Sequence, residues 1–187
     1  MFDLEAEYIS RKLRGCRNIL SIGCGTGDVE GLLMDRGFRI TGLDSSAEMI
    51  GKSRDAMGKV VGNAESLPFP GGCFDAVISV ASLQFIDHYE MALKQACHVM
   101  KKDGRIVLMM INPLSVFFKD RASRRDSYFR RIVTEDPLRI AAEVRRLFAV
   151  ELEFFLRIEG EEVSPGPAAP ENAAILVAGG MKKDEIR

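Results

Sequence analysis

The strongest constraint on the fold is a glycine-rich stretch, SIGCGTGDVEG at residues 21–31, which follows an apolar run. Gly23, Gly25 and Gly27 alternate with other residues, and this spacing disfavours the interior of a helix or strand. Glycine can take a positive φ angle and leaves no Cβ in the way of a neighbour. A strand that ends in such a loop and leads into a helix brings backbone N–H groups to the strand's carboxyl end. The stretch therefore predicts a ligand site on the main chain, with a plain strand–helix turn as the alternative.

Apolar and amphipathic segments alternate along the rest of the chain. Strands are expected at residues 18–22, 38–43, 59–62, 74–80, 105–111, 151–158 and 173–180. Helices are expected at residues 3–14, 28–35, 46–57, 88–100, 114–131 and 138–148. This order predicts an α/β fold, a Rossmann-like doubly wound sheet with helices on both faces, in a single domain of residues 1–187. The segment SPGPAAP, residues 164–170, is expected to be a loop.

Composition excludes several classes of protein. The 26 Lys and Arg residues nearly balance the 27 Asp and Glu residues, which argues against a surface that grips nucleic acid throughout. Apolar runs such as Ile106–Ile111 are too short to span a bilayer, and the acidic N-terminus lacks the order of a signal peptide. Four cysteines without a CxxC pair indicate reduced thiols and no metal site. We therefore expect a cytoplasmic protein without a membrane span.

Residues after the glycines narrow the ligand class. A dinucleotide fingerprint needs glycine where this chain has Asp28, so a nicotinamide cofactor is disfavoured. A ligand with one carboxylate, an amino group and a ribose fits better. Asp44, at the end of the second expected strand, is placed to accept hydrogen bonds from ribose hydroxyls. Ser45 and Glu48 have capping-box spacing, which would leave Asp44 free for the ligand; helix capping by Asp44 is the alternative.

Four segments, in this order, carry a resemblance to a known family: ILSIGCGTG, GLDSSAEMI, GNAESLPFPGGCFDAVIS and ALKQACHVMKKDGRIVLM. Together they resemble the class I S-adenosylmethionine-dependent methyltransferases, most of all the small type-11 group that includes ubiquinone and menaquinone methyltransferases. The resemblance covers about residues 18–111. It implies a seven-stranded sheet, mostly parallel with an antiparallel last strand, and S-adenosyl-L-methionine as the cofactor.

The resemblance also implies roles for side chains at the ends of the expected strands. The glycine loop would hold the methionine part of the cofactor, and Asp44 would bind its ribose. Met49 would pack near the adenine, unless it is ordinary helix core, and Asn63 and Ala64 would line the adenine edge. The predicted cofactor-binding set is Gly23, Cys24, Gly25, Gly27, Asp44, Ser45, Met49, Asn63 and Ala64.

Two residues depart from the family pattern. Ser21 stands at the foot of the glycine loop, where the family usually has an acidic residue, and Asn63 stands where Asp is frequent. Asn63 keeps its capacity to hydrogen-bond. The missing carboxylate at position 21 weakens the expected hold on the cofactor's ammonium group. Asp28 is the substitute that the sequence offers for it.

The expected chemistry is in-line methyl transfer from a sulfonium to a small-molecule acceptor. The leaving sulfur becomes neutral, so its departure needs no acid, although a carbon or oxygen nucleophile can need a base. No base stands out in the sequence. A surface or packing role is favoured for His98, His88 is a weak candidate, and packing is favoured for Tyr8. The catalytic residues therefore stay unassigned.

The substrate side is expected in the helical insertion, residues 113–148, which would form a lid. Residues 113–147 hold nine Lys and Arg against five Asp and Glu, which favours an anionic substrate or surface, with a solvated helix face as the alternative. A nucleic-acid substrate is disfavoured, because SVASLQFID after the fourth expected strand lacks an N-P-P-Y-like segment. The other function that the sequence leaves open is a cofactor-binding regulatory or partner protein without transfer activity.

Overall fold

A mixed eight-stranded sheet organises the chain in the computed structural model, which describes residues 1–134, 136–159 and 162–183. The strand order is β3-β2-β1-β4-β5-β8-β6-β7, and β1 to β5 run parallel to one another. β8 pairs antiparallel with β5 and β6, and β7 pairs antiparallel with β6. The strands are β1 Asn18–Ile22, β2 Arg39–Asp44, β3 Gly58–Val61, β4 Phe74–Val80, β5 Met100–Ile111, β6 Phe148–Glu159, β7 Glu162–Pro167 and β8 Ala173–Lys182.

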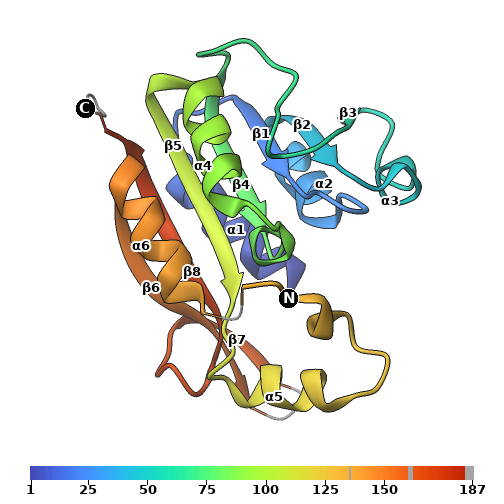
Figure 1. Cartoon of the computed structure of the whole chain (residues 1–187), viewed down its shortest axis with the longest axis vertical. Helices are drawn as coiled ribbons and strands as arrows, with labels where there is room; N and C mark the ends of the chain where they lie inside the picture. The colour runs from blue at the N-terminus through green and yellow to red at the C-terminus, as the bar shows by residue number, and fades with distance from the viewer. Residues whose placement is uncertain (135, 160–161, 184–187) are drawn as a thin grey trace.

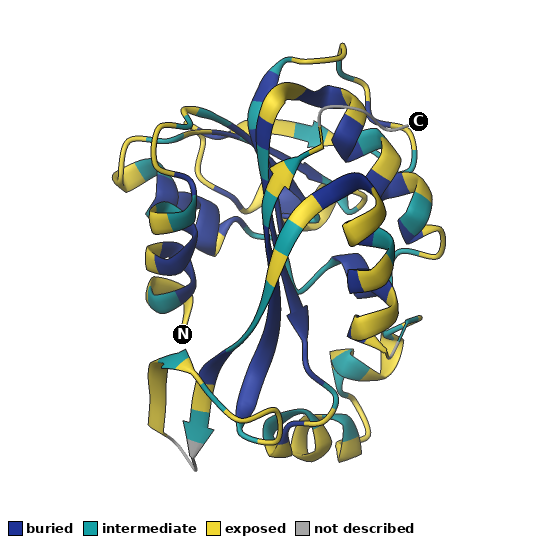
Figure 2. Ribbon diagram, turned by 90° about the vertical axis from the view of Figure 1, so that its left-hand side faces the viewer, coloured by how far each residue is buried: buried dark blue, intermediate teal, exposed yellow. Residues whose placement is uncertain are grey.

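Helices cover both faces of this sheet (Figure 1). α1 Phe2–Lys12, α2 Asp28–Asp35 and α3 Ala47–Gly51 contribute to one buried apolar cluster, and α4 Tyr89–Val99 and α6 Pro137–Leu147 contribute to the other. Figure 2 shows the buried strands between the two helical layers. β4 is apolar along most of its length because both of its faces are covered. The predicted doubly wound α/β fold with an antiparallel last strand is confirmed, with β7 as an additional edge strand.

Local predictions were wrong at α3 and at β7. The helix expected at residues 46–57 ends at Gly51, and the Ser53 Oγ donates to the Ile50 carbonyl there. The first half of the segment expected as a loop, SPGP at residues 164–167, belongs to β7. Proline lacks an N–H donor, and an edge strand tolerates it because one side of that strand has no partner.

The insertion after β5 divides into two parts that pack differently. Residues 114–131, expected as one helix, form α5 Val116–Ser123 and a short 3-10 turn, η2 Tyr128–Arg131. These elements extend beyond the carboxyl end of β5 (Figure 1). α6 instead buries Ile140 and Val144 against the sheet, so it belongs to a helical layer of the fold. Of the expected lid, residues 113–134 therefore lie outside the helical layers.

A buried glutamine ties this region to the sheet. Gln84 lies in a 3-10 turn after β4, η1 Leu83–Phe85. Its Nε2 donates to the Ile111 carbonyl at 3.0 Å, and its Oε1 accepts from the Ile111 N–H at 2.6 Å. The Gln84 carbonyl in turn accepts from the N–H groups of Val133 and Thr134. These bonds hold the β4–α4 connection, the end of β5 and the end of the insertion together.

Candidate cofactor site

The glycine loop lies at the carboxyl end of β1, beside the end of β2. Gly23, Gly25 and Gly27 have φ angles of 71°, 53° and 73°, a region in which other residues are strained. The Gly23 N–H donates to the Leu43 carbonyl at 2.7 Å, and the Gly25 N–H donates to the Asp44 Oδ2 at 2.7 Å. The Cys24 N–H also donates to the Leu43 carbonyl at 3.2 Å, so three hydrogen bonds fix the loop against the neighbouring strand.

The glycines of the loop are required for different reasons. A Cβ on Gly23 would overlap the Ser82 side chain, whose Oγ donates to the Ile22 carbonyl at 2.7 Å. Packing against the β4 end therefore explains Gly23 without a ligand. A Cβ on Gly25 would have the Met49 Cε as its nearest neighbour, at 3.7 Å, so the backbone there is open. Of the three glycines, Gly25 is therefore the one where a side chain would meet no close neighbour, and its N–H is donated to Asp44.

Asp44 is bonded on both of its carboxylate oxygens. Besides the bond from Gly25, its Oδ1 accepts from the Ser46 N–H at 2.9 Å. The expected Ser45–Glu48 capping box was wrong, because Ser46 caps α3 by accepting from the Met49 N–H. Asp44 is therefore not free in the expected sense. Its two oxygens have about four acceptor positions in all, and two of them remain for a ligand.

Three more residues of the predicted set lie near this edge. Met49 is 40% exposed and its Cε lies toward Gly25, so its interpretation as ordinary helix core was wrong. Ser45 is exposed beside Asp44. Cys24 turns its thiol away, into the gap left by Gly42, and burial raises the thiol pKa to about 12, with smaller effects from Glu30 and Asp44. The Cys24 N–H donates to the Leu43 carbonyl at 3.2 Å, and the Cys24 carbonyl accepts from the Gly27 N–H at 2.9 Å.

The segment after β3 also reaches this edge. The Gly62 N–H donates to the Asp44 carbonyl at 3.0 Å, which places the following residues beside the end of β2. The Asn63 Oδ1 accepts from the Glu65 N–H at 2.8 Å, so the side-chain oxygen forms the turn and the amide remains for other partners. Ala64 is buried against the core.

Sequence reasoning missed a buried acidic group under the glycine loop. The Ser21 Oγ donates to the Glu30 Oε1 at 2.5 Å, and Glu30 is only 3% exposed. Burial raises the pKa of Glu30, the hydrogen bond from Ser21 opposes this, and the charges of Asp28 and Asp44 add to it. The available signal was the helical spacing, which places Glu30 three residues before the buried Leu33.

A second buried carboxyl group, Glu5 of α1, lies close enough for the charge of Glu30 to affect it. Glu5 is 3% exposed, and its Oε2 has no hydrogen-bond partner among the described residues. Burial raises the Glu5 pKa to about 7, the amino group of Met1 lowers it, and the charge of Glu30 raises it. Asp28, the substitute suggested by the sequence, is exposed and bonded to Thr26 instead.

The three base candidates lie outside the loop. His88 is exposed at the start of α4, and His98 is exposed near the end of that helix. The Tyr8 hydroxyl donates to the Glu153 Oε2 at 2.8 Å, and its ring packs on Phe155. The packing role expected for Tyr8 is therefore what its contacts show.

An aromatic side chain from the insertion, that of Tyr128, lies against the connection between β4 and α4. Tyr128 stacks on Phe85, with ring centroids 4.4 Å apart. Partial burial raises the Tyr128 pKa, and the charge of Asp44 raises it further. The Tyr128 hydroxyl therefore lies within the electrostatic reach of Asp44.

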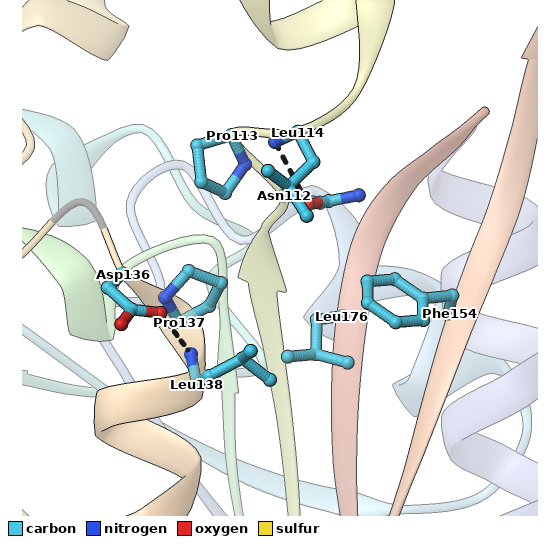
Figure 3. Close-up of a pocket in the computed structure, with 8 residues that line it drawn as sticks. All are labelled: Asn112, Pro113, Leu114, Asp136, Pro137, Leu138, Phe154 and Leu176. Carbon is cyan, nitrogen blue, oxygen red and sulfur yellow. Dashed lines mark hydrogen bonds between the residues drawn. The ribbon is translucent and has the colours of Figure 1, made fainter. Parts of the chain in front are cut away.

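A separate apolar cavity of about 310 Å³ lies at the carboxyl end of β5. Figure 3 shows its walls, which come from the segment after β5, the start of α6, and strands β6 and β8. They are formed by Asn112, Pro113, Leu114, Asp136, Pro137, Leu138, Phe154 and Leu176. The walls are mostly apolar, and the Asp136 carboxylate accepts from the Leu138 N–H.

One part of the sequence matches a model of a known protein family. Residues 20–108 match the family model described as a methyltransferase domain. Residues 20–108 therefore belong to the class I S-adenosylmethionine-dependent methyltransferases. The matched model is that of the type-11 group, which the sequence segments also resemble.

Individual relatives agree with this family. A demethylmenaquinone methyltransferase of Thermotoga maritima is 35% identical over 100 residues, which cover 51% of this chain and 44% of that protein. A ubiquinone/menaquinone biosynthesis C-methyltransferase of Rhizobium rhizogenes is 27% identical over 155 residues, which cover 73% of this chain and 60% of that protein. The chain thus spans about half the length of the curated relatives it matches. A solved structure of a Thermotoga maritima protein is described as a SAM-dependent methyltransferase and possible histamine N-methyltransferase. It has a TM-score of 0.81 at 22% identity, and the match covers 97% of this chain and 89% of that chain.

S-adenosylmethionine is the cofactor of this family, and the residues present fit it. The molecule has an α-amino acid end, a sulfonium, a ribose and an adenine. The open backbone at Gly25 and the two remaining acceptor positions on Asp44 match the amino acid and the ribose. Among the described residues no cluster of His, Cys, Asp and Glu could hold a metal ion, and no helix has the length and apolar character of a membrane span.

We predict that Glu5 makes the protein less stable as the pH rises. The folded-state pKa of Glu5, about 7, exceeds the ordinary value of 4.5, so the folded protein holds this proton more tightly than the unfolded chain. Stability from Glu5 is present below pH 4.5 and is lost between pH 4.5 and 7. Glu5→Gln should therefore raise the free energy of unfolding at pH 8 by roughly 3 kcal/mol and leave it nearly unchanged at pH 4.5.

Urea denaturation at both pH values measures this effect. Glu7→Gln, an exposed site on the same helix, is the matched control and should show no pH-dependent gain. Equal stability of Glu5→Gln and the native chain at pH 8 would contradict the prediction.

Proposed function

We propose that the chain is an S-adenosylmethionine-dependent methyltransferase that acts on a small-molecule acceptor. The observation that carries this proposal is the bond between the Gly25 N–H and the Asp44 carboxylate, at the carboxyl ends of adjacent parallel strands. It brings an open stretch of main chain and a ribose acceptor to one edge of the sheet, where ligands of such folds bind. The family membership of residues 20–108 supports the same function.

The proposed cofactor contacts follow the edge of the sheet. The backbone of Gly23, Cys24, Gly25 and Gly27 would hold the methionine part, and Asp44 would accept from the ribose hydroxyls. Around the adenine we assign Met49 from α3 as an apolar cover, Asn63 as an amide donor and Ala64 through its backbone. Ser45 is assigned to the rim beside Asp44. Exposure of Met49 and Ser45 at this edge supports their assignments.

S-adenosylmethionine supplies an electrophilic methyl group on a positively charged sulfur. The chain's own part is to hold that end of the site rigidly and to position the acceptor in line with it. Such positioning can contribute roughly 7–11 kcal/mol in favourable cases. The hydrogen bonds of Gly23 and Gly25 to β2 fix the loop, and Ser82 packs against it from the β4 side. We assign no general base to the described residues.

The acceptor would approach between the β4–α4 connection and the insertion, where Tyr128 stacks on Phe85. We propose a small molecule with an apolar part. The mostly apolar cavity behind this edge supports the proposal, as do the quinone-related names of the relatives. A nucleic-acid acceptor stays disfavoured, and a cytoplasmic location stays a prediction.

We predict that S-adenosylmethionine and S-adenosylhomocysteine both stabilise the protein. Either ligand at a hundred times its dissociation constant should raise the free energy of unfolding by about 2.7 kcal/mol. Asp44→Asn should weaken both by at least about tenfold, because it removes charge-assisted hydrogen bonds worth roughly 1.5–3 kcal/mol each. Thermal unfolding with titrated ligand measures this. Asp55→Asn, an exposed control site, should bind as the native chain does, and NADH should have no effect.

We predict that a labelled methyl group is transferred from S-adenosylmethionine to a small molecule of a cell extract. Separation of the extract by size after the reaction identifies the acceptor class, and the Asp44→Asn variant should give at least about tenfold less label at limiting cofactor. Tight cofactor binding with no transfer to any fraction would instead favour the alternative, a cofactor-binding partner or regulatory protein.

The basic side chains of the insertion are proposed to recruit an anionic acceptor. Arg124, Arg125, Arg130 and Arg131 are all exposed on this segment. Changing all four to Glu should lower kcat/KM for an anionic acceptor at low salt severalfold, and added salt should reduce the difference because it screens exposed charges. Cofactor affinity is the control and should not change. Unchanged kcat/KM at low salt would show that these residues are an ordinary solvated surface.

A further inference from the structure

A buried carboxylate lies where the family pattern loses one. Ser21 occupies the position at the foot of the glycine loop that is usually acidic, and its Oγ donates to the Glu30 Oε1 at 2.5 Å. Glu30 is the third residue of α2, which begins directly after Gly27. The carboxylate absent from β1 is therefore present beside the same position, carried by α2.

Acidic side chains surround Glu30, and the amino group of Met1 is a positive group that acts on one of them, Glu5. The charges of Asp28 and Asp44 act on Glu30, and the charge of Glu30 acts on Glu5. Among the described residues, none of these four carboxylates forms an ion pair with Lys, Arg or His.

A second observation points to a missing cation. The Oε2 of Glu5 is buried and has no hydrogen-bond partner among the described residues. A buried carboxyl group without a partner is unfavourable, and a bound cation would relieve that cost. A cation bound beside Glu5 and Glu30 would add to the effect of the Met1 amino group.

The cofactor assigned to the loop carries such a cation. If the end of the glycine loop, at the start of α2, holds the α-carboxylate of its methionine part, the α-ammonium on the same carbon lies close to the foot of the loop. We propose that Glu30, positioned by Ser21 and backed by Glu5, is the carboxylate that receives this α-ammonium group. This inference rests on the proposed function, and it replaces Asp28 as the substitute for the missing acid.

A purely structural role for Glu30 makes a different prediction. An acidic residue in the first turn of α2 stabilises the helix through its dipole, and that effect does not depend on the ligand's amino group. Two ligands separate these roles. S-adenosylhomocysteine has the α-ammonium group, whereas 5′-methylthioadenosine keeps the adenine, the ribose and the sulfur but has no amino acid part.

Calorimetric titration of the full chain with both ligands is the test. Glu30→Gln keeps an oxygen that can accept from Ser21, and it should weaken S-adenosylhomocysteine by about tenfold or more. Its affinity for 5′-methylthioadenosine should change less than about threefold. The exposed Asp28→Asn variant is the matched control and should retain the native ratio of the two affinities.

A transposition variant adds a test of rescue. Ser21→Asp combined with Glu30→Ser moves the carboxylate to β1 and the hydroxyl to α2, and it should restore S-adenosylhomocysteine binding to within about threefold of the native chain. It also decides the question if Glu30→Gln fails to fold, which circular dichroism checks.

Three outcomes would overturn the inference while native binding of S-adenosylhomocysteine remains intact. Glu30→Gln could weaken both ligands equally, it could leave both unchanged, or Asp28→Asn could cause the selective loss. If the native chain binds neither ligand, the proposed function itself fails.

Discussion

The hydrogen bond from the Gly25 N–H to the Asp44 carboxylate is the constraint on which the candidate site depends. It joins the ends of two neighbouring parallel strands and fixes the glycine loop in its left-handed conformations. Because the same carboxylate also accepts from the Ser46 N–H, the loop, the strand end and the start of α3 share one anchor. A parallel sheet makes this possible, since the carboxyl ends of its strands meet at one edge.

The acidic side chains near that hydrogen bond are the second feature on which the candidate site depends. Four carboxylates gather near the loop, those of Glu5, Asp28, Glu30 and Asp44, and burial raises the pKa of the two glutamates. A ligand with an ammonium and a sulfonium would meet a complementary field there, whereas a pyrophosphate would meet repulsion. The same acidic character that disfavours a dinucleotide thus agrees with the cofactor of the family.

Side-chain hydrogen bonds and ring stacking connect the insertion to the end of β5 and to the β4–α4 connection. Gln84 satisfies both backbone groups of Ile111 and receives two N–H groups from the insertion, while Tyr128 stacks on Phe85. These contacts place the insertion over the sheet edge without making it part of the core. α6, by contrast, packs into the core and completes one helical layer. The chain therefore separates the candidate cofactor site, which is held by hydrogen bonds between strands, from the peripheral segment that we propose faces the acceptor.

The sequence by itself determined the order of strands and helices, the glycine loop and the acid at the end of β2. These features are local, since hydrophobic periodicity and glycine spacing are read along the chain. The same local rules failed at α3, where Ser46 rather than Ser45 forms the cap, and at β7, where prolines lie in an edge strand. Only the tertiary structure decided which groups meet. Gly23 is required by Ser82, which is distant in the chain, and Glu30 lies beside Ser21 because α2 folds back over the end of β1. The buried carboxylates of α1 and α2 come together because these helices pack against each other, and their raised pKa values arise from that burial. Helical spacing could have marked Glu30 as lying near the buried side of α2, but the proximity of the carboxylates is a property of three-dimensional packing and is not encoded in local spacing.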